Sequence, residues 1–355
     1  MYEEFEGTKP VSERMKVDLD ALAAYLRAHV EDFSGELQIE QFKGGQSNPT
    51  FKLSAGDRRY VLRTKPAPAA KLLPSAHAID REYRVMDALS KAGFPAARQY
   101  ALCLDESVIG RAFYVMEFIE GRVLWDQSLP GMTPAQRSAH YDEMNRVIAQ
   151  LHSLDYRALG LESFGKPGNY FARQIDRWTR QYKAAETEPI AAMDALIDWL
   201  PQNIPAGEIT TIVHGDYRLD NMIFHPTEPR ILAVLDWELS TLGHPLADFS
   251  YHCMSWHIAP GLFRGIGGLD LAALGIPDED AYVAKYSERT GITVNKSDFR
   301  FYLAYNMFRM AGILQGIMKR YQDGTASSEQ ALRSGQAARP MAEMGWAYVS
   351  GERSL

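Results

Sequence analysis

Two stretches of the sequence are the most informative, HGDYRLDN at residues 214–221 and LDWE at residues 235–238. Apolar runs flank the first stretch, which predicts a polar loop held between two short strands. Asp216 and Asn221 are five residues apart, and Asp236 follows fifteen residues after Asn221. Two hard oxygen ligands for magnesium and a further carboxylate that accepts a hydroxyl proton are what phosphoryl transfer requires. The pattern favours that chemistry, and side chains that merely cap turns are the alternative.

The sequence before this core has mostly β character. Asp18 precedes apolar residues at helical spacing, which predicts an opening helix over 18–31 with Asp18 as its N-cap. A second helical pattern covers 77–93 and ends near a glycine. Strands are predicted at 37–42, 50–55, 59–64, 97–104 and within 111–121, the first three as an antiparallel meander.

From about residue 122 the pattern is mostly helical, with helical segments expected at 134–155, 170–185, 190–200, 278–291 and 298–320. Only the β-like runs around the two quoted stretches interrupt it. The glycine-rich segment 259–277 is expected to form a loop. Its GIGG does not lie between a strand and a helix, as a dinucleotide-binding fingerprint would require.

The composition excludes several classes of protein. No apolar run approaches the roughly 18 residues of a membrane span. Cys103 and Cys253 are too few for a disulfide framework, and the charged N-terminus lacks the apolar core of a signal peptide, so we expect a cytoplasmic protein. The net charge of −7 and the absence of a long basic tract disfavour a nucleic-acid binder. We expect an enzyme or binding protein for a small molecule, with no membrane partner and with a homodimer as one option for its assembly.

HGDYRLDN followed by LDWE resembles the catalytic loop and metal-binding segment of the aminoglycoside phosphotransferase and choline kinase superfamily. The resemblance implies an α+β, bilobal protein-kinase-like fold, with an N-terminal lobe over 1–118 and a helical C-terminal lobe over 119–355. It also implies ATP and Mg²⁺ as cofactors and a small-molecule hydroxyl as the phosphate acceptor. Trp237 and Glu238 replace the Phe-Gly of protein kinases, which favours the small-molecule branch.

The resemblance assigns roles to the residues of this core. Asp216 would be the catalytic base, and Asn221 and Asp236 would be the magnesium ligands. Arg218 stands where protein kinases carry a lysine that steadies the transferred phosphoryl group, and a surface arginine is the alternative. Two residues would be structural: His214 would brace the loop, and Asp248 in GHPLADF at 243–249 would tie it by hydrogen bonds.

The first strands would hold the phosphates of the nucleotide. The turn GGQSNPTF lies where kinases carry the loop that covers the phosphates, and Ser47 and Asn48 can hydrogen-bond to phosphate oxygens. Arg63 in YVLR stands in the position of the usual phosphate-anchoring lysine, and Glu82 would be its partner on the following helix. Lys65 is an alternative anchor.

The adenine would pair with a hinge between the lobes. VMEFIEG at 115–121 resembles that hinge in its order along the chain. Backbone groups near Glu117 and Ile119 would then meet the edge of the adenine.

A narrower resemblance bears on the acceptor. GGQSNPTF, YVLRTKP, REYRVMDAL, YFARQIDRW and HGDYRLDN together resemble the kinase domain that is fused to acyl-CoA dehydrogenases and its stand-alone bacterial relatives. That branch implies hydroxyacyl groups on coenzyme A, or hydroxy acids, as acceptors.

The charge distribution supports an anionic acceptor independently. Residues 168–183 have a net charge of +3 and residues 296–320 a net charge of +4, although solvated helix faces would look the same. A polycationic aminoglycoside would need an acidic wall, so an antibiotic kinase is the less favoured alternative. A non-catalytic nucleotide-binding regulator is a further alternative, raised by the arginine at position 63. The candidate acceptor-binding residues are Arg173, Arg177, Trp178 and Arg309.

Overall fold

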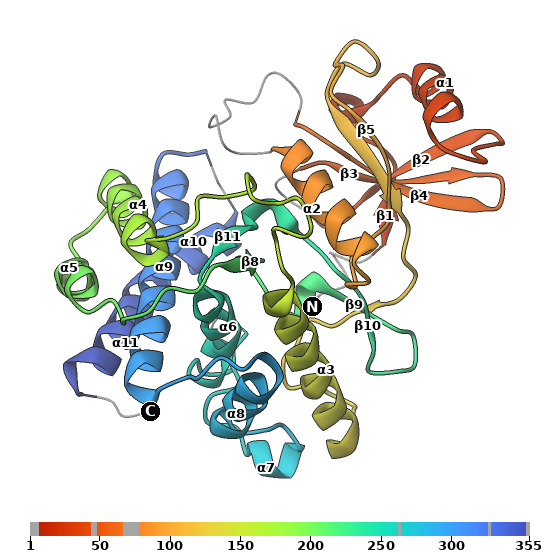
Figure 1. The fold of residues 1–355 in the computed structure, drawn as a ribbon. Helices are drawn as coiled ribbons and strands as arrows, with labels where there is room; N and C mark the ends of the chain where they lie inside the picture. The colour runs from red at the N-terminus through yellow and green to blue at the C-terminus, as the bar shows by residue number, and fades with distance from the viewer. Residues whose placement is uncertain (1–6, 44–47, 67–77, 262–263, 326–327, 353–355) are drawn as a thin grey trace. The chain divides into compact units, whose positions relative to one another are not determined.

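The computed structural model describes residues 7–43, 48–66, 78–261, 264–325 and 328–352 (Figure 1). The chain forms two compact units. The N-terminal unit comprises residues 1–125, 157–164 and 220–240, and the C-terminal unit comprises residues 126–156, 165–219 and 241–355. An antiparallel sheet dominates the first unit and helices dominate the second, which confirms the expected α+β fold class.

The main sheet of the N-terminal unit has six strands in the order β1-β2-β3-β4-β6-β5, and all neighbours pair antiparallel. The expected meander over the first three predicted strands is confirmed, with Gly56 at a φ of +56° in its second turn. The two-residue strand β1 was not predicted because so short a segment carries no alternation. The strands are β1 (Thr8–Lys9), β2 (Leu37–Phe42), β3 (Thr50–Ala55), β4 (Arg58–Thr64), β5 (Gln99–Cys103) and β6 (Phe113–Glu117).

Two helices pack on this sheet. The expected opening helix is α1 (Leu19–His29), and the Asp18 carboxylate accepts a hydrogen bond from the Ala21 backbone N–H at 2.9 Å. Its apolar face packs with the inward side chains of β3, which alternate with outward ones. Helix α2 (Ile79–Lys91) lies against β5 and β6 and buries Glu82, which is 2% exposed.

A second sheet of the N-terminal unit positions the metal-binding candidates. It consists of β7 (Arg122–Val123), β9 (Met222–Phe224) and β10 (Ile231–Val234), in the order β10-β9-β7. Gly121, the residue before β7, lies very close to β9. A Cβ added at this position would lie 2.3 Å from the Phe224 carbonyl oxygen. The short helices η4 (Leu219–Asn221) and η5 (Trp237–Leu239) flank β9 and β10, so Asn221 and Asp236 stand at the ends of neighbouring strands.

The C-terminal unit is built around α9, which buries most of its length and contacts α4, α6, α10 and α11 (Figure 1). Strands β8 (Thr211–Val213) and β11 (Thr241–Gly243) pair beside α6. None of the helices in the described ranges combines the length and hydropathy of a membrane span. The helices are α3 (Pro134–Ser153), α4 (Tyr170–Ala185), α5 (Ala191–Trp199), α6 (Pro245–Cys253), α7 (Leu271–Leu274), α8 (Glu279–Thr290), α9 (Lys296–Gln322), α10 (Glu329–Gln336) and α11 (Ala338–Ser350), with short 3-10 turns η3 (Leu200–Gln202) and η6 (Met254–Trp256). A further 3-10 turn, η2 (Glu13–Met15), belongs to the N-terminal unit.

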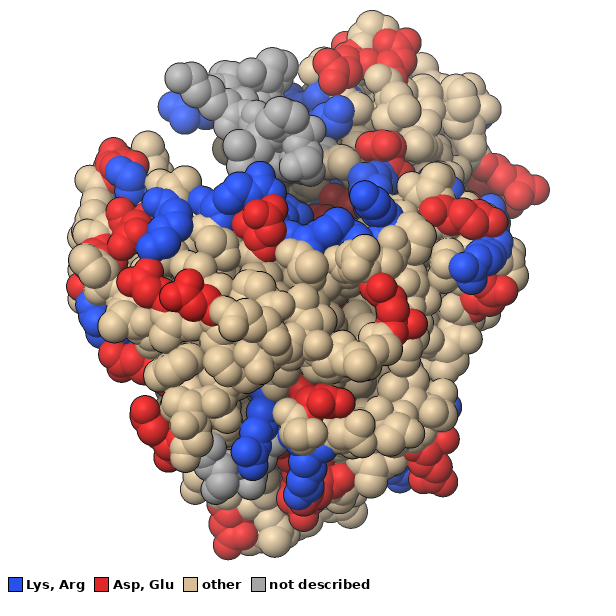
Figure 2. Space-filling view, turned by 60° about the vertical axis from the view of Figure 1, so that its left-hand side comes forward, with Lys and Arg blue, Asp and Glu red and all other residues tan. Residues whose placement is uncertain are grey.

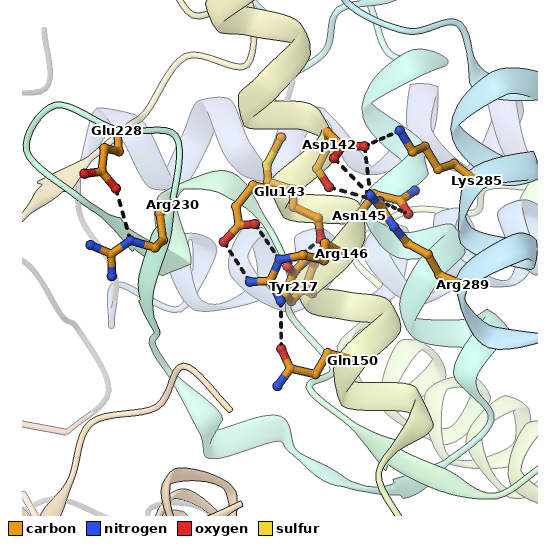
Figure 3. Close-up of polar contacts among 11 residues, drawn as sticks. Asp142, Glu143, Asn145, Arg146, Gln150, Tyr217, Glu228, Arg230, Lys285 and Arg289 are labelled. Carbon is orange, nitrogen blue, oxygen red and sulfur yellow. Dashed lines mark hydrogen bonds and ion pairs between the residues drawn. The ribbon is translucent and has the colours of Figure 1, made fainter. Parts of the chain in front are cut away.

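A polar cluster fixes α8 on α3 (Figure 3). The Arg289 guanidinium donates to both carboxylate oxygens of Asp142 at 2.9 Å and to Asn145 Oδ1 at 2.8 Å. Asn145 Nδ2 donates in turn to the Tyr282 carbonyl at 2.8 Å. Both bonds to Asp142 come from Nη2 and the bond to Asn145 comes from Nη1, so the Arg289 guanidinium holds α8 on α3. Helix α3 in turn anchors the loop described next.

Candidate active site

The loop that carries Asp216 follows β8 and is anchored by α6. The backbone N–H groups of His214 and Gly215 donate to the two carboxylate oxygens of Asp248 at 2.7 and 2.8 Å. Burial alone would raise the pKa of Asp248, but His152, the charge of His214 and the backbone donor outweigh burial and lower the pKa. The expected role of Asp248 in tying the loop is therefore confirmed.

Two donors fix the carboxylate of Asp216 itself. The Tyr251 hydroxyl donates to Oδ1 at 2.6 Å, and Arg218 Nε donates to Oδ2 at 3.0 Å. Farther along the loop, the buried Tyr217 hydroxyl donates to the Met144 carbonyl on α3 at 2.8 Å (Figure 3). The loop thus presents one carboxylate in a fixed orientation. Tyr251 was not predicted, although it lies three residues after Asp248, on the same helix.

Arg309 also contacts this loop. Arg309 is 8% exposed, and its Nη2 donates to the Gly215 carbonyl at 2.6 Å. The same guanidinium lies 5.3 Å from the centre of the Tyr251 ring and 5.6 Å from that of Trp178. Arg309 and Trp178, two of the candidate acceptor-binding residues, therefore meet beside the loop, and the contacts of Arg309 fit a residue that positions the loop.

The other two candidates lie on α4. Arg173 Nη2 donates to the Lys166 carbonyl at 2.6 Å, and the exposed Arg177 lies 5.6 Å from the Trp178 ring. Figure 2, in which the side that carries α4 comes forward, shows lysine and arginine side chains gathered on this face. Several cations of α4 and α9 are paired locally: Arg180 with Asp176, Lys183 with Asp194, Lys296 with Asp280 and Lys319 with Asp323. Contact of Arg173 and Arg177 with an acceptor stays a prediction.

In the N-terminal unit, Arg63 on β4 lies within 4 Å of three carboxylates. Its Nε lies 2.8 Å from Glu82 Oε2, which confirms the predicted pair. Its Nη2 lies 3.0 Å from Asp236 Oδ1 and 3.7 Å from Glu238 Oε2. Burial disfavours the charge of Arg63, but interactions with Tyr114, Glu82, Asp236 and Glu238 outweigh burial and raise the pKa of the guanidinium. A permanent cation is therefore held where the anchor was predicted.

Glu82 accepts two further hydrogen bonds. The donors are the Tyr114 hydroxyl at 3.0 Å and Asn48 Nδ2 at 2.7 Å. Asn48 is 1% exposed, so its amide connects the residues before β3 to α2. Ser47, the other predicted phosphate-binding residue of GGQSNPTF, lies outside the described residues.

Asn221 and Asp236 come together through the backbone between them. The Leu235 N–H donates to the Asn221 carbonyl at 2.8 Å, which brings Asn221 next to the residue that precedes Asp236. Asp236 has a φ of +64°, an unusual conformation for a residue other than glycine and one that recurs at functional sites. A carboxylate and an amide oxygen fit Mg²⁺, which takes most of its ligands from nucleotide phosphates and water. Within the described ranges, no cluster of three or more His, Cys, Asp or Glu could hold a metal on its own.

The predicted hinge begins at the end of β6. The Glu117 backbone N–H donates to the Arg98 carbonyl at 2.8 Å, so the sheet already uses this donor. Ile119 lies two residues beyond the strand end. Pairing of adenine with backbone groups here stays a prediction.

Comparison with known proteins identifies the family. The model of the Phosphotransferase enzyme family matches residues 38–285. The chain belongs to this family. The chain is 47% identical over 349 residues to mouse acyl-CoA dehydrogenase family member 10, covering 98% of this chain and 32% of that protein. It is 44% identical over 336 residues to human acyl-CoA dehydrogenase family member 11, covering 93% of this chain and 43% of that protein. The chain thus spans less than half the length of these curated relatives.

Solved structures agree with this assignment. A Ralstonia eutropha protein, described provisionally as an aminoglycoside phosphotransferase, is 66% identical with a TM-score of 0.88, covering 95% of this chain and 99% of that one. A choline kinase from Cryptosporidium parvum shares the fold, with 14% identity and a TM-score of 0.59. The match covers 94% of this chain and 99% of that one. The expected family resemblance is confirmed.

Two buried histidines of the C-terminal unit should make the stability of the protein depend on pH. Burial lowers the pKa of His244 and of His252 from 6.5 to about 4. Between these values the unfolded chain binds protons that the folded one excludes, so the free energy of unfolding should fall as the pH falls through this window. A shift of this size corresponds to roughly 3 kcal/mol for each histidine.

Urea unfolding at several pH values tests this dependence. His252→Gln should show a shallower loss of stability below about pH 6.5 than the wild type. His29→Gln, which changes an exposed histidine of α1, is the control and should keep the wild-type slope. Parallel curves for wild type and His252→Gln would contradict the assignment.

Proposed function

We propose that this protein transfers the γ-phosphoryl group of ATP, with Mg²⁺, to a hydroxyl of a small anionic molecule. The observation that carries the proposal is the Asp216 carboxylate, fixed on one oxygen by Tyr251 and on the other by Arg218. A general base needs such an orientation to take the proton of an attacking hydroxyl. Along the chain, Asn221 follows five residues later, as phosphoryl transfer requires of a metal ligand near the base.

In the proposed reaction the acceptor oxygen forms a bond to the γ-phosphorus while the bond from that phosphorus to ADP breaks. Asp216 takes the hydroxyl proton, and Arg218 offsets the negative charge beside it. Asn221 and Asp236 would hold magnesium, which when bound neutralises charge on the phosphates. Arg63, held by Glu82, would contribute a fixed positive charge to the phosphate site.

The acceptor would be a hydroxyacyl group on coenzyme A or a free hydroxy acid. Support comes from the likeness to the acyl-CoA dehydrogenase family members over nearly the whole of this chain. An aminoglycoside acceptor is the second candidate, favoured by the description of the Ralstonia protein. A non-catalytic nucleotide-binding role is disfavoured, because Asp216, Asn221 and Asp236 are all present.

A panel of acceptors tests the proposal. ADP formation should be compared for hydroxy acids, hydroxyacyl-coenzyme A thioesters, choline and kanamycin at saturating MgATP. We expect kcat/KM for the anionic acceptors to exceed that for kanamycin by at least about 100-fold, which corresponds to roughly 2.7 kcal/mol of transition-state binding. Efficient phosphorylation of kanamycin would restore the antibiotic-kinase alternative.

A further inference from the structure

The two oxygens of the Asp236 carboxylate have different surroundings. Arg63 Nη2, from β4 of the same unit, donates to Oδ1 at 3.0 Å. The Asp236 side chain is 33% exposed and makes no capping hydrogen bond to η5. Among the residues that the structure describes, no hydrogen bond or ion pair reaches Oδ2. One oxygen of this predicted magnesium ligand is therefore occupied, and the other can meet a metal.

Arg63 is held firmly on its own side. Its side chain is 12% exposed, and its Nε lies 2.8 Å from Glu82 Oε2. Glu82 is fixed in turn, because the Tyr114 hydroxyl and Asn48 Nδ2 donate to its carboxylate at 3.0 and 2.7 Å. Since a guanidinium is planar, holding Nε also sets the direction of Nη2. The donor that meets Asp236 is therefore kept in one place.

The backbone around Asp236 is equally constrained. On one side, the Leu235 N–H donates to the Asn221 carbonyl at 2.8 Å. On the other, the buried Trp237 indole donates through Nε1 to the Val234 carbonyl at 2.9 Å. Asp236 lies between them with a φ of +64°. Neither partner of the Arg63–Asp236 contact can adapt freely, so the carboxylate keeps Oδ1 toward the arginine.

A carboxylate with one oxygen occupied suits some metal ions better than others. Mg²⁺ is small and requires a nearly ideal octahedron, which it fills with single oxygens from carboxylates, phosphates and water. Ca²⁺ is larger and takes about 6 to 8 oxygens, often both oxygens of one carboxylate. Occupation of Oδ1 therefore costs Mg²⁺ little, whereas it denies Ca²⁺ a second oxygen.

We propose that Arg63 is a metal-specificity residue, which occupies Asp236 Oδ1, leaves one oxygen for the metal and so favours Mg²⁺ over Ca²⁺. The proposal rests on the phosphotransferase function argued above, and it gives Arg63 a role beyond that of a phosphate anchor. Removing a side chain that hydrogen-bonds to a metal-binding carboxylate typically changes metal affinity by about 10- to 100-fold. A lysine ammonium is a compact point donor and does not reproduce the fork that joins Glu82 to Asp236.

Binding of ATP with each metal tests the proposal without an acceptor. Thermal unfolding is followed at saturating ATP while Mg²⁺ or Ca²⁺ is titrated, and the ratio of the two midpoint concentrations gives the metal preference. The affinities of the metals for ATP itself cancel when variants are compared. Arg63→Lys should lower the preference for Mg²⁺ by about 10-fold. Arg58→Lys, at an exposed arginine of β4 that pairs with Asp32, is the matched control and should keep the wild-type ratio.

A double variant guards against misfolding and against a lysine that still reaches Oδ1. Arg63→Met combined with Glu82→Gln removes both charges of the buried pair, so neither is left unpaired. The net charge near Asp236 stays the same, and any remaining change in the local field acts alike on two ions of equal charge. This variant should also lose at least about 10-fold in metal preference, and its result decides the test.

The outcomes separate this proposal from the proposed function. A wild type that prefers Mg²⁺, with that preference reduced in the double variant, supports the role of Arg63 even if no acceptor is phosphorylated, in which case the proposed function fails alone. An unchanged ratio in the double variant overturns the proposal, even if the wild type is an active kinase. A wild type without metal-dependent stabilisation, or without a preference for Mg²⁺, overturns it as well.

Discussion

Replacing Asp216 by asparagine is expected to lower kcat by at least about 100-fold, the low end of what a general base contributes. The amide keeps the shape of the side chain but accepts no proton from the acceptor hydroxyl. Stabilisation by MgATP should stay close to that of the wild type, because the base touches the acceptor and not the nucleotide. Steady-state rates with the best acceptor and thermal unfolding with MgATP measure the two effects.

A matched control separates catalysis from charge. Asp176→Asn removes a carboxylate from the exposed face of α4, where Asp176 pairs with Arg180, and should keep the wild-type kcat. If Asp216→Asn turned over at a rate near that of the wild type, Asp216 would lose its assignment as the base.

Replacing Asp236 by alanine should abolish the magnesium-dependent part of the stabilisation by ATP. With ligand at 100 times its dissociation constant, the wild type should gain roughly 2.7 kcal/mol from MgATP. The variant should gain no more from MgATP than from ATP without the metal, because a carboxylate ligand has been removed. Thermal unfolding with ATP, in the presence of magnesium or of a chelator, gives the comparison.

Glu238→Ala is the control for this second variant. Glu238 also lies near Arg63, with its Oε2 3.7 Å from Nη2, but it is not a predicted magnesium ligand. Loss of magnesium dependence in both variants would indicate that the charge around Arg63, and not ligation by Asp236, produces the effect. Retention in Asp236→Ala would contradict the assignment directly.

Local hydrophobic periodicity in the sequence predicted the helices and strands that bury one face. The helix α4 (Tyr170–Ala185) coincides with the helical segment expected from sequence, and the β2-β3-β4 meander agrees within a residue. Helices α10 and α11 were not predicted, because Gly335 and Gly345 disfavour helix by propensity. In the structure each of these glycines packs against α9, where an added Cβ would lie 2.8 Å from Met318 and 3.0 Å from Met307. Tertiary packing outweighs propensity there.

Sequence likewise predicted some residues of the candidate site and missed others. Spacing and order along the chain identified the Arg63–Glu82 pair and the contact of Asp248 with the loop that carries Asp216. Tyr251 lies outside any recognised motif, and only the folded chain brings its hydroxyl to the Asp216 carboxylate. Counting charge along α9 could not reveal that Arg309 is buried against the Gly215 carbonyl, because burial depends on neighbouring helices.

The most direct test of the central claim is to follow the phosphoryl group itself. ATP labelled in its γ-phosphate should be incubated with magnesium, a hydroxy-acid or hydroxyacyl-coenzyme A acceptor, and either the wild type or Asp216→Asn. We predict that the wild type moves the label onto the acceptor hydroxyl as a phosphate ester, and that the variant does not. Label released only as inorganic phosphate, or an equal yield of ester from both proteins, would contradict the account.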